Sequence, residues 1–382
     1  RLIANTISEI QMRNQAHNKD FAILYRTNAQ SRAFEESLRK RNIAYKIYGG
    51  LSFYQRKEIK DLLAYYRLSI NPHDEEALKR IINYPTRGIG TTTIQKVNIF
   101  ANTNNKSIWE VINCLDETEI NINKGTKKKL KEFALMIDNF IINSKHKDAY
   151  TVAEEIAKQT GLFNDLYTDK SPEGVSKFEN VQELLNGIKD FSETAEKGLN
   201  KLPDFMQDIA LLTDQDKETD NDFNKVTLMT IHAAKGLEFP FVFVVGLEEN
   251  LFPSMMSGES QESLEEERRL FYVAITRAEK RLFLSFASTR FKWGQFIDSQ
   301  PSRFIGELDD SCLEKQELSL TKKDYSPHKI YAKTKRYKKK APPTTQKVIA
   351  PKNLTNINRA KNIHINESDL SKITNGMQVK HS

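Results

Sequence analysis

Short apolar runs and a capping signal organise the start of the chain. Residues 21–25 and 45–48 are apolar or aromatic runs that are too short for a helix, which predicts two buried strands. Between them, Thr27 and Gln30 have the spacing of a capping box, and this predicts a helix that runs to about Arg41. A strand, a helix and a second strand in so short a segment form a βαβ unit, whose two strands are parallel.

The hydrophobic spacing then becomes helical over a long central segment. A helix is predicted from Arg56 until Asn71-Pro72 stops it. From residue 73 to about residue 222, apolar positions recur at helical spacing between Asn- and Lys-rich connections, which predicts an all-helical domain. The acidic stretch at its end, residues 214–222, is typical of an exit linker.

The α/β pattern resumes after that segment. Three strands are predicted, at residues 226–231, 241–245 and 281–286, and a helix is predicted at 264–278. The simplest fold is an α/β domain with a parallel sheet. Residues 1–72 and 223–308 form this domain, and an all-helical insertion at 73–222 interrupts it.

Composition separates a folded body from a basic tail. The 382 residues are 38% hydrophobic, which is enough for packed cores in two or three domains. The net charge of +7 is concentrated at 321–350, where ten Lys/Arg and one acid give +9, so the rest of the chain carries −2. Nucleic-acid binding by the body must therefore depend on a local groove. We expect residues 309–370 to be a basic, largely disordered linker that still attracts phosphates.

Composition also excludes several classes of protein. The sequence has no apolar run of membrane-spanning length and no signal-peptide pattern at its start, so we expect no membrane partner and a cytoplasmic location. Cys114 and Cys312 are the only cysteines, and no His/Cys cluster surrounds them. This argues against a disulfide framework and against a bound metal such as zinc.

The segment after the strand predicted at 226–231 contains charged residues beside a glycine. His232, Lys235, Gly236 and Glu238 lie in this loop, and loops at strand ends of open α/β sheets are common ligand sites. Small residues beside a glycine also let another molecule approach the backbone. The alternative is that Lys235 and Glu238 are ordinary solvent-exposed charges.

Arg277 lies at the end of the predicted helix, just before a strand, so its side chain should emerge at an edge of the sheet. A guanidinium there presents a rigid fork of donors, which suits phosphoryl oxygens better than a flexible ammonium does. The alternative is a surface arginine that is paired with a nearby acid such as Glu279.

Two further segments have features of DNA contacts. Arg87, Gly88, Ile89 and Gly90 form a glycine turn that leads into a helix N-terminus. Exposed amide groups and the helix dipole favour an anion there, such as a DNA phosphate. Trp293 lies in a strand-exit loop, where a tryptophan can stack on a base. An ordinary helix–helix turn and a buried tryptophan are the alternatives.

Four segments match, in order and context, motifs of one enzyme group. They are FAILYRTNAQSR at 21–32, YGGLSFYQRKEIKD at 48–61, TLMTIHAAKGLEF at 227–239 and EERRLFYVAITRA at 266–278. Over residues 1 to about 308 the chain resembles the C-terminal motor half of superfamily 1 helicases of the UvrD/PcrA/Rep group. This resemblance implies a RecA-like motor domain, ATP with Mg²⁺ as cofactor, and 3′→5′ unwinding of single/double-strand DNA junctions along single-stranded DNA. It also implies a bacterial, nucleoid-associated protein.

The resemblance assigns roles to individual residues. Arg277 corresponds to the arginine that reaches the γ-phosphate across the interdomain cleft, and Glu238 corresponds to the acid that contacts the nucleotide sugar. Contacts with single-stranded DNA are implied for Arg26, Asn28, His232 and Trp293. The turn Arg87–Gly90 corresponds to a duplex-contacting turn of the helical insertion.

The resemblance does not extend to the whole nucleotide site. The 382 residues contain no G-x-x-x-x-G-K-[ST] loop, and the family's Asp-Glu motif for metal and water is not matched. We therefore expect that an N-terminal motor domain holds the metal and most phosphate ligands, and that this chain alone hydrolyses no ATP. Residues 371–382 resemble the start of the small Tudor-like module of PcrA-type enzymes, which contacts RNA polymerase, and we expect the module to be truncated.

Two other functions are weighed against the motor. A non-catalytic DNA-binding or regulatory module would also lack the phosphate loop. A helicase–nuclease subunit would need a nuclease carboxylate cluster after the motor, and residues 309–382 contain nothing of that kind. The sequence does not choose among repair, replication and transcription-coupled processes.

Overall fold

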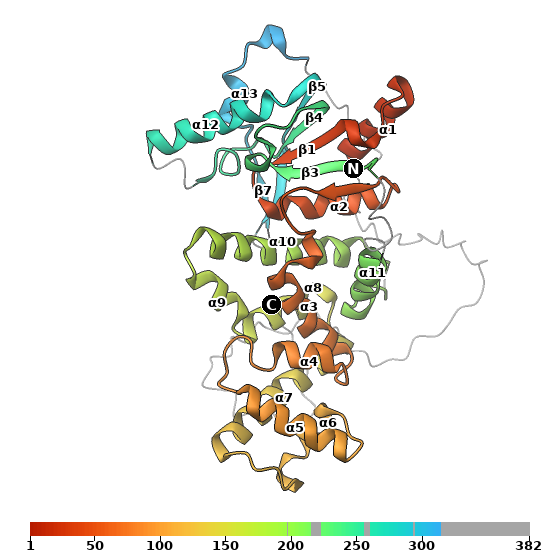
Figure 1. The fold of residues 1–382 in the computed structure, drawn as a ribbon, viewed down its shortest axis with the longest axis vertical. Helices are drawn as coiled ribbons and strands as arrows, with labels where there is room; N and C mark the ends of the chain where they lie inside the picture. The colour runs from red at the N-terminus through yellow and green to blue at the C-terminus, as the bar shows by residue number, and fades with distance from the viewer. Residues whose placement is uncertain (197, 215–222, 256–259, 293–294, 315–382) are drawn as a thin grey trace, which may run out of the picture. The chain divides into compact units, whose positions relative to one another are not determined.

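The computed structural model describes residues 1–196, 198–214, 223–255, 260–292 and 295–314, which Figure 1 draws in colour. Four features of the sequence lie outside these residues: the exit linker from residue 215 to residue 222, Trp293, the linker beyond residue 314 and the segment 371–382. The helices and strands named below all belong to the compact unit Arg1–Glu314.

A five-stranded parallel sheet is the centre of the α/β part (Figure 1). Its strand order is β2 (Tyr45–Ile47), β3 (Val226–Thr230), β1 (Phe21–Tyr25), β4 (Phe239–Val245) and β5 (Ala278–Ser285). All neighbouring strands in it are parallel. The segments before and after the helical insertion therefore build one sheet, and the predicted α/β class is confirmed. β1 and β2 have the predicted parallel direction, but they are not neighbours, because β3 lies between them.

Both faces of the sheet are covered. The helices on its two faces are α1 (Leu2–Asn14) and α2 (Ser31–Arg39) on one side, and α12 (Gln261–Ile275) and α13 (Arg303–Gly306) on the other. Side chains of a strand alternate between the faces, so Ile23 packs in the first core and Leu24 in the second. Burial on both sides explains why the strands read as continuous apolar runs.

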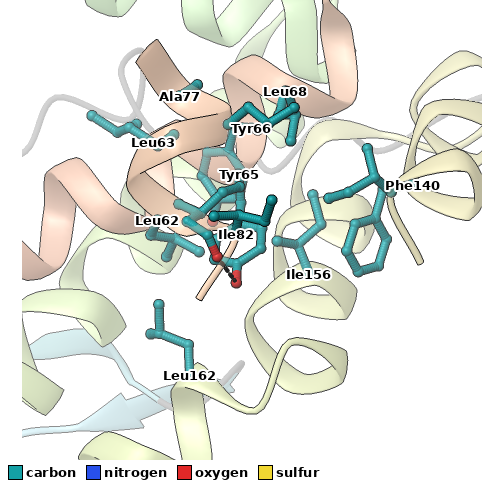
Figure 2. Packing of buried hydrophobic residues seen from close by; sticks show 14 of the residues in the cluster. Leu62, Leu63, Tyr65, Tyr66, Leu68, Ala77, Ile82, Phe140, Ile156 and Leu162 are labelled. Carbon is teal, nitrogen blue, oxygen red and sulfur yellow. Dashed lines mark hydrogen bonds between the residues drawn. The ribbon is translucent and has the colours of Figure 1, made fainter. Parts of the chain in front are cut away.

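The helical insertion has its own core. Its helices are α3 (Lys57–Ile70), α4 (Glu75–Ile81), α5 (Thr91–Thr103), α6 (Ile108–Asn113), α7 (Lys124–His146), α8 (Ala149–Gln159), α9 (Leu162–Thr168), α10 (Pro172–Thr194) and α11 (Leu202–Asp214). Figure 2 shows Tyr65 and Tyr66 of α3 in one cluster with Phe140 of α7 and Ile156 of α8. By its packing α3 therefore belongs to the helical core, although it lies in the range 1–72.

Some element ends differ from those predicted. α2 ends at Arg39 rather than at about Arg41, and the helix predicted at 264–278 is α12, which is shifted three residues toward the N-terminus at both ends. The sheet is followed by an antiparallel hairpin of β6 (Thr289–Lys292) and β7 (Gln295–Asp298), where only a loop was predicted. None of the helices in the described segments is both long enough and apolar enough to cross a membrane.

Candidate nucleotide and nucleic-acid sites

Arg277 lies at the predicted place, between the end of α12 and the start of the edge strand β5. Its Nε donates to the carbonyl oxygen of Val273 (3.0 Å), its Nη1 to that of Leu237 (3.1 Å) and its Nη2 to Oγ1 of Thr276 (3.0 Å). The backbone N–H of Phe239 donates to the carbonyl of Arg277 (2.9 Å). These bonds fix the guanidinium beside the segment that carries Glu238.

Within the residues that the structure describes, Arg277 and Glu238 form no ion pair with each other or with another side chain. Within the described residues Arg277 takes part in no ion pair, so the alternative pairing with Glu279 is not observed. Glu238 is exposed, and no hydrogen bond to it occurs in the same part of the chain. A half-buried guanidinium without a carboxylate partner fits a phosphoryl group, because its planar fork matches two oxygens.

The backbone between these residues and His232 is open to a ligand. His232–Ala234 form a single 3₁₀ turn, and Gly236 adopts a left-handed conformation with φ of 84°. Among the residues that the structure describes, no atom lies within 4 Å of the position that a Cβ of Gly236 would occupy. Gly236 thus supplies both the turn and the free space that a closely approaching ligand needs. Within the described segments, no three His, Cys, Asp or Glu side chains are grouped to hold a metal ion.

Arg26, Asn28 and His232 form a second group, after the carboxyl ends of β1 and β3. Arg26 makes a bidentate ion pair with Glu267 of α12, through Nη2 (2.6 Å) and Nε (3.0 Å). Asn28 is exposed. Its loop is closed by Gln30, whose side-chain oxygen accepts the N–H groups of Arg26 and Thr27, both at 2.9 Å.

The environment of His232 favours its neutral form. Burial lowers the pKa of the imidazole, and the positive charge of Arg26 lowers it further, while the charge of Glu267 opposes this shift. At neutral pH the imidazole of His232 can therefore accept a hydrogen bond from a nucleic acid or donate one to it, but it carries little positive charge.

These two groups of residues lie at opposite ends of the strands. Glu238 and Arg277 precede the amino ends of β4 and β5, whereas Arg26, Asn28 and His232 follow the carboxyl ends of β1 and β3. The loop from His232 to Glu238 connects the two ends. One rigid sheet therefore carries a phosphate-type site and a polar loop cluster at a fixed separation.

The turn Arg87–Gly90 lies in the helical insertion, away from both groups, between α4 and α5. The guanidinium of Arg87 is occupied: Nη1 donates to the carbonyls of Ile81 and Tyr84, both at 3.0 Å, and Nη2 donates to the hydroxyl of Tyr65 (2.7 Å). Arg87 therefore holds the turn in place, and an anion would have to meet the backbone of the turn.

The backbone of this turn is prepared for such a contact. Asn83 accepts the N–H groups of Arg87 (3.0 Å) and Ile89 (2.9 Å). Within the described part of the chain, no hydrogen bond uses those of Gly88, Gly90, Thr91 and Thr92. Gly88 has φ of 72°, and a Cβ there would lie 2.5 Å from Nζ of Lys129, so this ammonium covers the turn. Lys129 was not singled out from the sequence, where it follows two other lysines, Lys127 and Lys128.

An ion pair between Glu248 and Arg290, which was not predicted from the sequence, supports the hairpin that follows the sheet. Glu248, at 2% exposure, accepts Nε of Arg290 (2.8 Å) and Nη2 of Arg290 (2.6 Å). Its Oε1 also accepts the N–H of Ala287 (2.9 Å). The predicted stacking residue Trp293 is not among the described residues.

Comparison with known proteins supports the family that the sequence motifs indicate. The pattern of the family described as UvrD-like helicase C-terminal domain matches residues 1–289. The ATP-dependent DNA helicase PcrA of Staphylococcus epidermidis strain RP62A is 40% identical over 312 residues, which are 81% of this chain and 42% of that protein. The PcrA of Staphylococcus aureus strain Mu50 is 40% identical over 304 residues, 79% of this chain and 41% of that protein. The chain thus spans about two fifths of these relatives.

Proposed function

Because the chain belongs to the UvrD-like helicase C-terminal domain family, we propose that it is the C-terminal half of an ATP-dependent 3′→5′ DNA helicase. The proposal rests on the contacts of Arg277. Three hydrogen bonds hold its guanidinium beside Glu238, and it has no carboxylate partner in the described residues. An arginine that only stabilised the fold at the surface would be expected to pair with an acid such as Glu279.

In this proposal Arg277 is an arginine finger. It stabilises charge on the γ-phosphate of a nucleotide whose Mg²⁺ and other phosphate ligands are supplied by the N-terminal motor domain, and Glu238 contacts the nucleotide sugar. Bound ATP supplies the phosphoryl group whose transfer drives movement. A group of this kind contributes about 10³–10⁵ in rate in other enzymes. Its present contacts with Val273, Leu237 and Thr276 preorganise the guanidinium.

The other end of the strands is proposed to bind the single strand. Asn28 and His232 contact the DNA from the loops after β1 and β3, and Trp293 stacks on a base. Arg26 is proposed to add positive charge there, although its ion pair with Glu267 must open before it can bind a phosphate directly. Since both sites belong to one rigid sheet, closure at Arg277 moves the DNA contacts together with the nucleotide contact.

The insertion is proposed to contact the duplex. The N–H groups of Gly88, Gly90, Thr91 and Thr92 have no hydrogen-bond partner among the described residues, and they are proposed to meet a DNA phosphate, with Lys129 adding a positive charge beside them. Arg87 acts by holding the turn. We also propose that the segment 371–382 begins a module that contacts RNA polymerase.

ATP hydrolysis that depends on single-stranded DNA tests the proposal. We expect no hydrolysis above background by the 382-residue chain alone, and DNA-stimulated hydrolysis when it is joined to an N-terminal motor half. In the joined enzyme, Arg277→Ala should lower kcat by about 10³-fold or more, with a smaller loss of nucleotide affinity, because the group acts mainly in the transition state.

The matched control is Arg281→Ala. Arg281 is an arginine of the adjoining edge strand β5, and its side chain is 56% exposed, so kcat should not change. Steady turnover by the chain alone, or an Arg277→Ala defect confined to nucleotide affinity, would contradict the proposal.

A further inference from the structure

A buried arginine joins the loop that carries Asn28 to the helical insertion. Arg56, at 8% exposure, donates to the carbonyl oxygen of Asn28 (2.9 Å) and to Oγ of Ser31 (2.8 Å). The same guanidinium donates to Oδ1 of Asn180 in α10 (2.8 Å). Asn180 in turn donates from Nδ2 to Oε1 of Glu58 (2.6 Å). One continuous network therefore runs from α10 to the backbone of Asn28.

A second arginine fastens the same helix. Arg32 of α2 donates from Nε (2.9 Å) and Nη2 (2.7 Å) to Oε1 of Glu183 in α10, and from Nη1 to Glu36 (2.9 Å). Gly187 lies one turn further along α10. A Cβ at this glycine would lie 2.5 Å from Nη1 of Arg32 and 2.8 Å from its Cζ. The glycine is therefore what allows the guanidinium to lie against the helix.

The contacts on the loop are backbone contacts that flank an exposed side chain. Arg56 binds the carbonyl of Asn28 from inside, while the Asn28 side chain is exposed. A buried network in which every group has a partner holds its members in one arrangement, and the loss of one member loosens the others. The position of α10 thus restricts the conformations that the Asn28 loop can adopt.

We propose that Arg56 and Asn180 are positioning residues for binding of a single-stranded polynucleotide, through which α10 of the insertion holds the Asn28 loop in its binding conformation. This inference rests on the proposed function of Asn28 as a DNA contact. It adds that the insertion, which does not itself carry this contact, sets the affinity of the loop for the single strand.

The test is binding of a fluorescent oligothymidylate to the 382-residue chain, measured by anisotropy. Asn180→Ala should weaken binding about fivefold to tenfold, the effect of about one lost hydrogen bond on the ordering of the loop. Asn180→Asp keeps an acceptor for Arg56, but it removes the donor to Glu58 and brings two carboxylates into contact, so it should weaken binding at least as much as Asn180→Ala. Gly187→Ala displaces the Arg32 guanidinium from α10 without removing a polar group. It should therefore weaken binding in the same direction, and it replaces Asn180→Ala if that variant does not fold.

Two matched controls separate positioning from general destabilisation. Arg67→Gln breaks the ion pairs of Arg67 with Asp74 and Glu76 inside the insertion, and Gly125→Ala adds a methyl group in α7 with nothing closer than 3.6 Å. Both variants should leave the affinity for oligothymidylate unchanged. An equal loss for Arg67→Gln and Asn180→Ala would overturn the proposal.

The double variant distinguishes this inference from the proposed DNA contact. Asn28→Ala alone should weaken binding, and Asn28→Ala with Asn180→Ala should weaken it no further, because Asn180 acts through Asn28. Fully additive losses would overturn the positioning role, as would a loss for Asn28→Ala without one for Asn180→Ala. No loss for Asn28→Ala would refute the DNA contact at this residue and the inference with it.

Discussion

His232 gives the proposed single-strand site a definite pH dependence. Burial and the nearby charge of Arg26 lower the pKa of this histidine below its ordinary value of 6.5. The free protein therefore holds a neutral imidazole at neutral pH. A DNA phosphate close to the ring would raise the pKa again, because it stabilises the charged form. Binding then takes up a proton.

The affinity of the chain for oligothymidylate should consequently rise, relative to His232→Gln, as the pH falls below 6.5. The sign follows from linkage, since the complex binds more protons than the free protein and acid favours the complex. For folding the sign is opposite: the lowered pKa means that stability is lost as the pH falls, so each titration needs a check by circular dichroism that the chain is folded. A constant affinity ratio between about pH 8 and about pH 5.5 would rule out a phosphate contact of His232.

At the level of residues, the sequence predicts location better than orientation. Arg277 was expected at a helix end beside a sheet edge and is found there, because local periodicity specifies that junction. Arg26 was expected to contact single-stranded DNA, and Arg87 was expected to lie in a duplex-contacting turn. The partners of their guanidinium groups were not predicted: Arg87 donates to backbone carbonyls, and Arg26 pairs with Glu267, which is 241 positions away. Such partners depend on tertiary packing, and no short pattern encodes them.

Two adjacent glutamates of the segment after β4 differ sharply in environment. Glu248 is buried and pairs with Arg290, whereas Glu249 pairs with Arg303, whose side chain is 49% exposed. Glu248 also accepts the N–H of Ala287 at the exit from β5. It therefore anchors the hairpin of β6 and β7 to the end of the sheet, while Glu249 makes an ordinary surface contact.

Glu248→Gln should lower the free energy of unfolding by about 3 kcal/mol. This is the low end for a broken buried ion pair, because the Arg290 side chain remains 30% exposed. The control Glu249→Gln should cost less than about 1 kcal/mol, as surface pairs do. Urea denaturation of both variants measures the difference. Equal losses would contradict the larger contribution of the buried pair, and no loss for Glu248→Gln would show that the hairpin does not depend on Glu248.

At the level of elements, the strands of the sheet and most helices follow from apolar patterning, since each is long or strongly apolar. The hairpin of β6 and β7 was missed, because each strand has four residues and mixes polar with aromatic side chains. The packing of α3 in the helical core was missed for another reason. Helical periodicity shows that a helix has an apolar face, but it does not say which core that face joins.

The distribution of charge over the whole molecule separates two ways of binding DNA. Residues 321–350 carry a charge of +9, and the remainder carries −2. Contacts of a basic segment with phosphates release counterions and depend steeply on salt, whereas base stacking does not. The two contributions can therefore be told apart by a salt titration.

Deleting residues 321–350 should reduce the slope of log affinity for single-stranded DNA against log salt, with only a modest loss at high salt. Trp293→Ala should do the reverse, weakening binding by about 1–3 kcal/mol with little change in slope. If the deletion abolishes binding at every salt concentration and Trp293→Ala has no effect, then the groove on the folded body does not bind DNA.

The strand order of the sheet has a consequence for synthesis on the ribosome. β1 lies between β3 and β4, and both of these are encoded after the insertion. Roughly 200 residues separate Tyr25 from Val226, so at translation speeds of about 5–20 residues per second the nascent β1 has no neighbouring strand for on the order of ten seconds or longer. The helices in between contact mainly one another and need not wait. The fully apolar β1 is thus the part of the nascent chain with the greatest need of a chaperone.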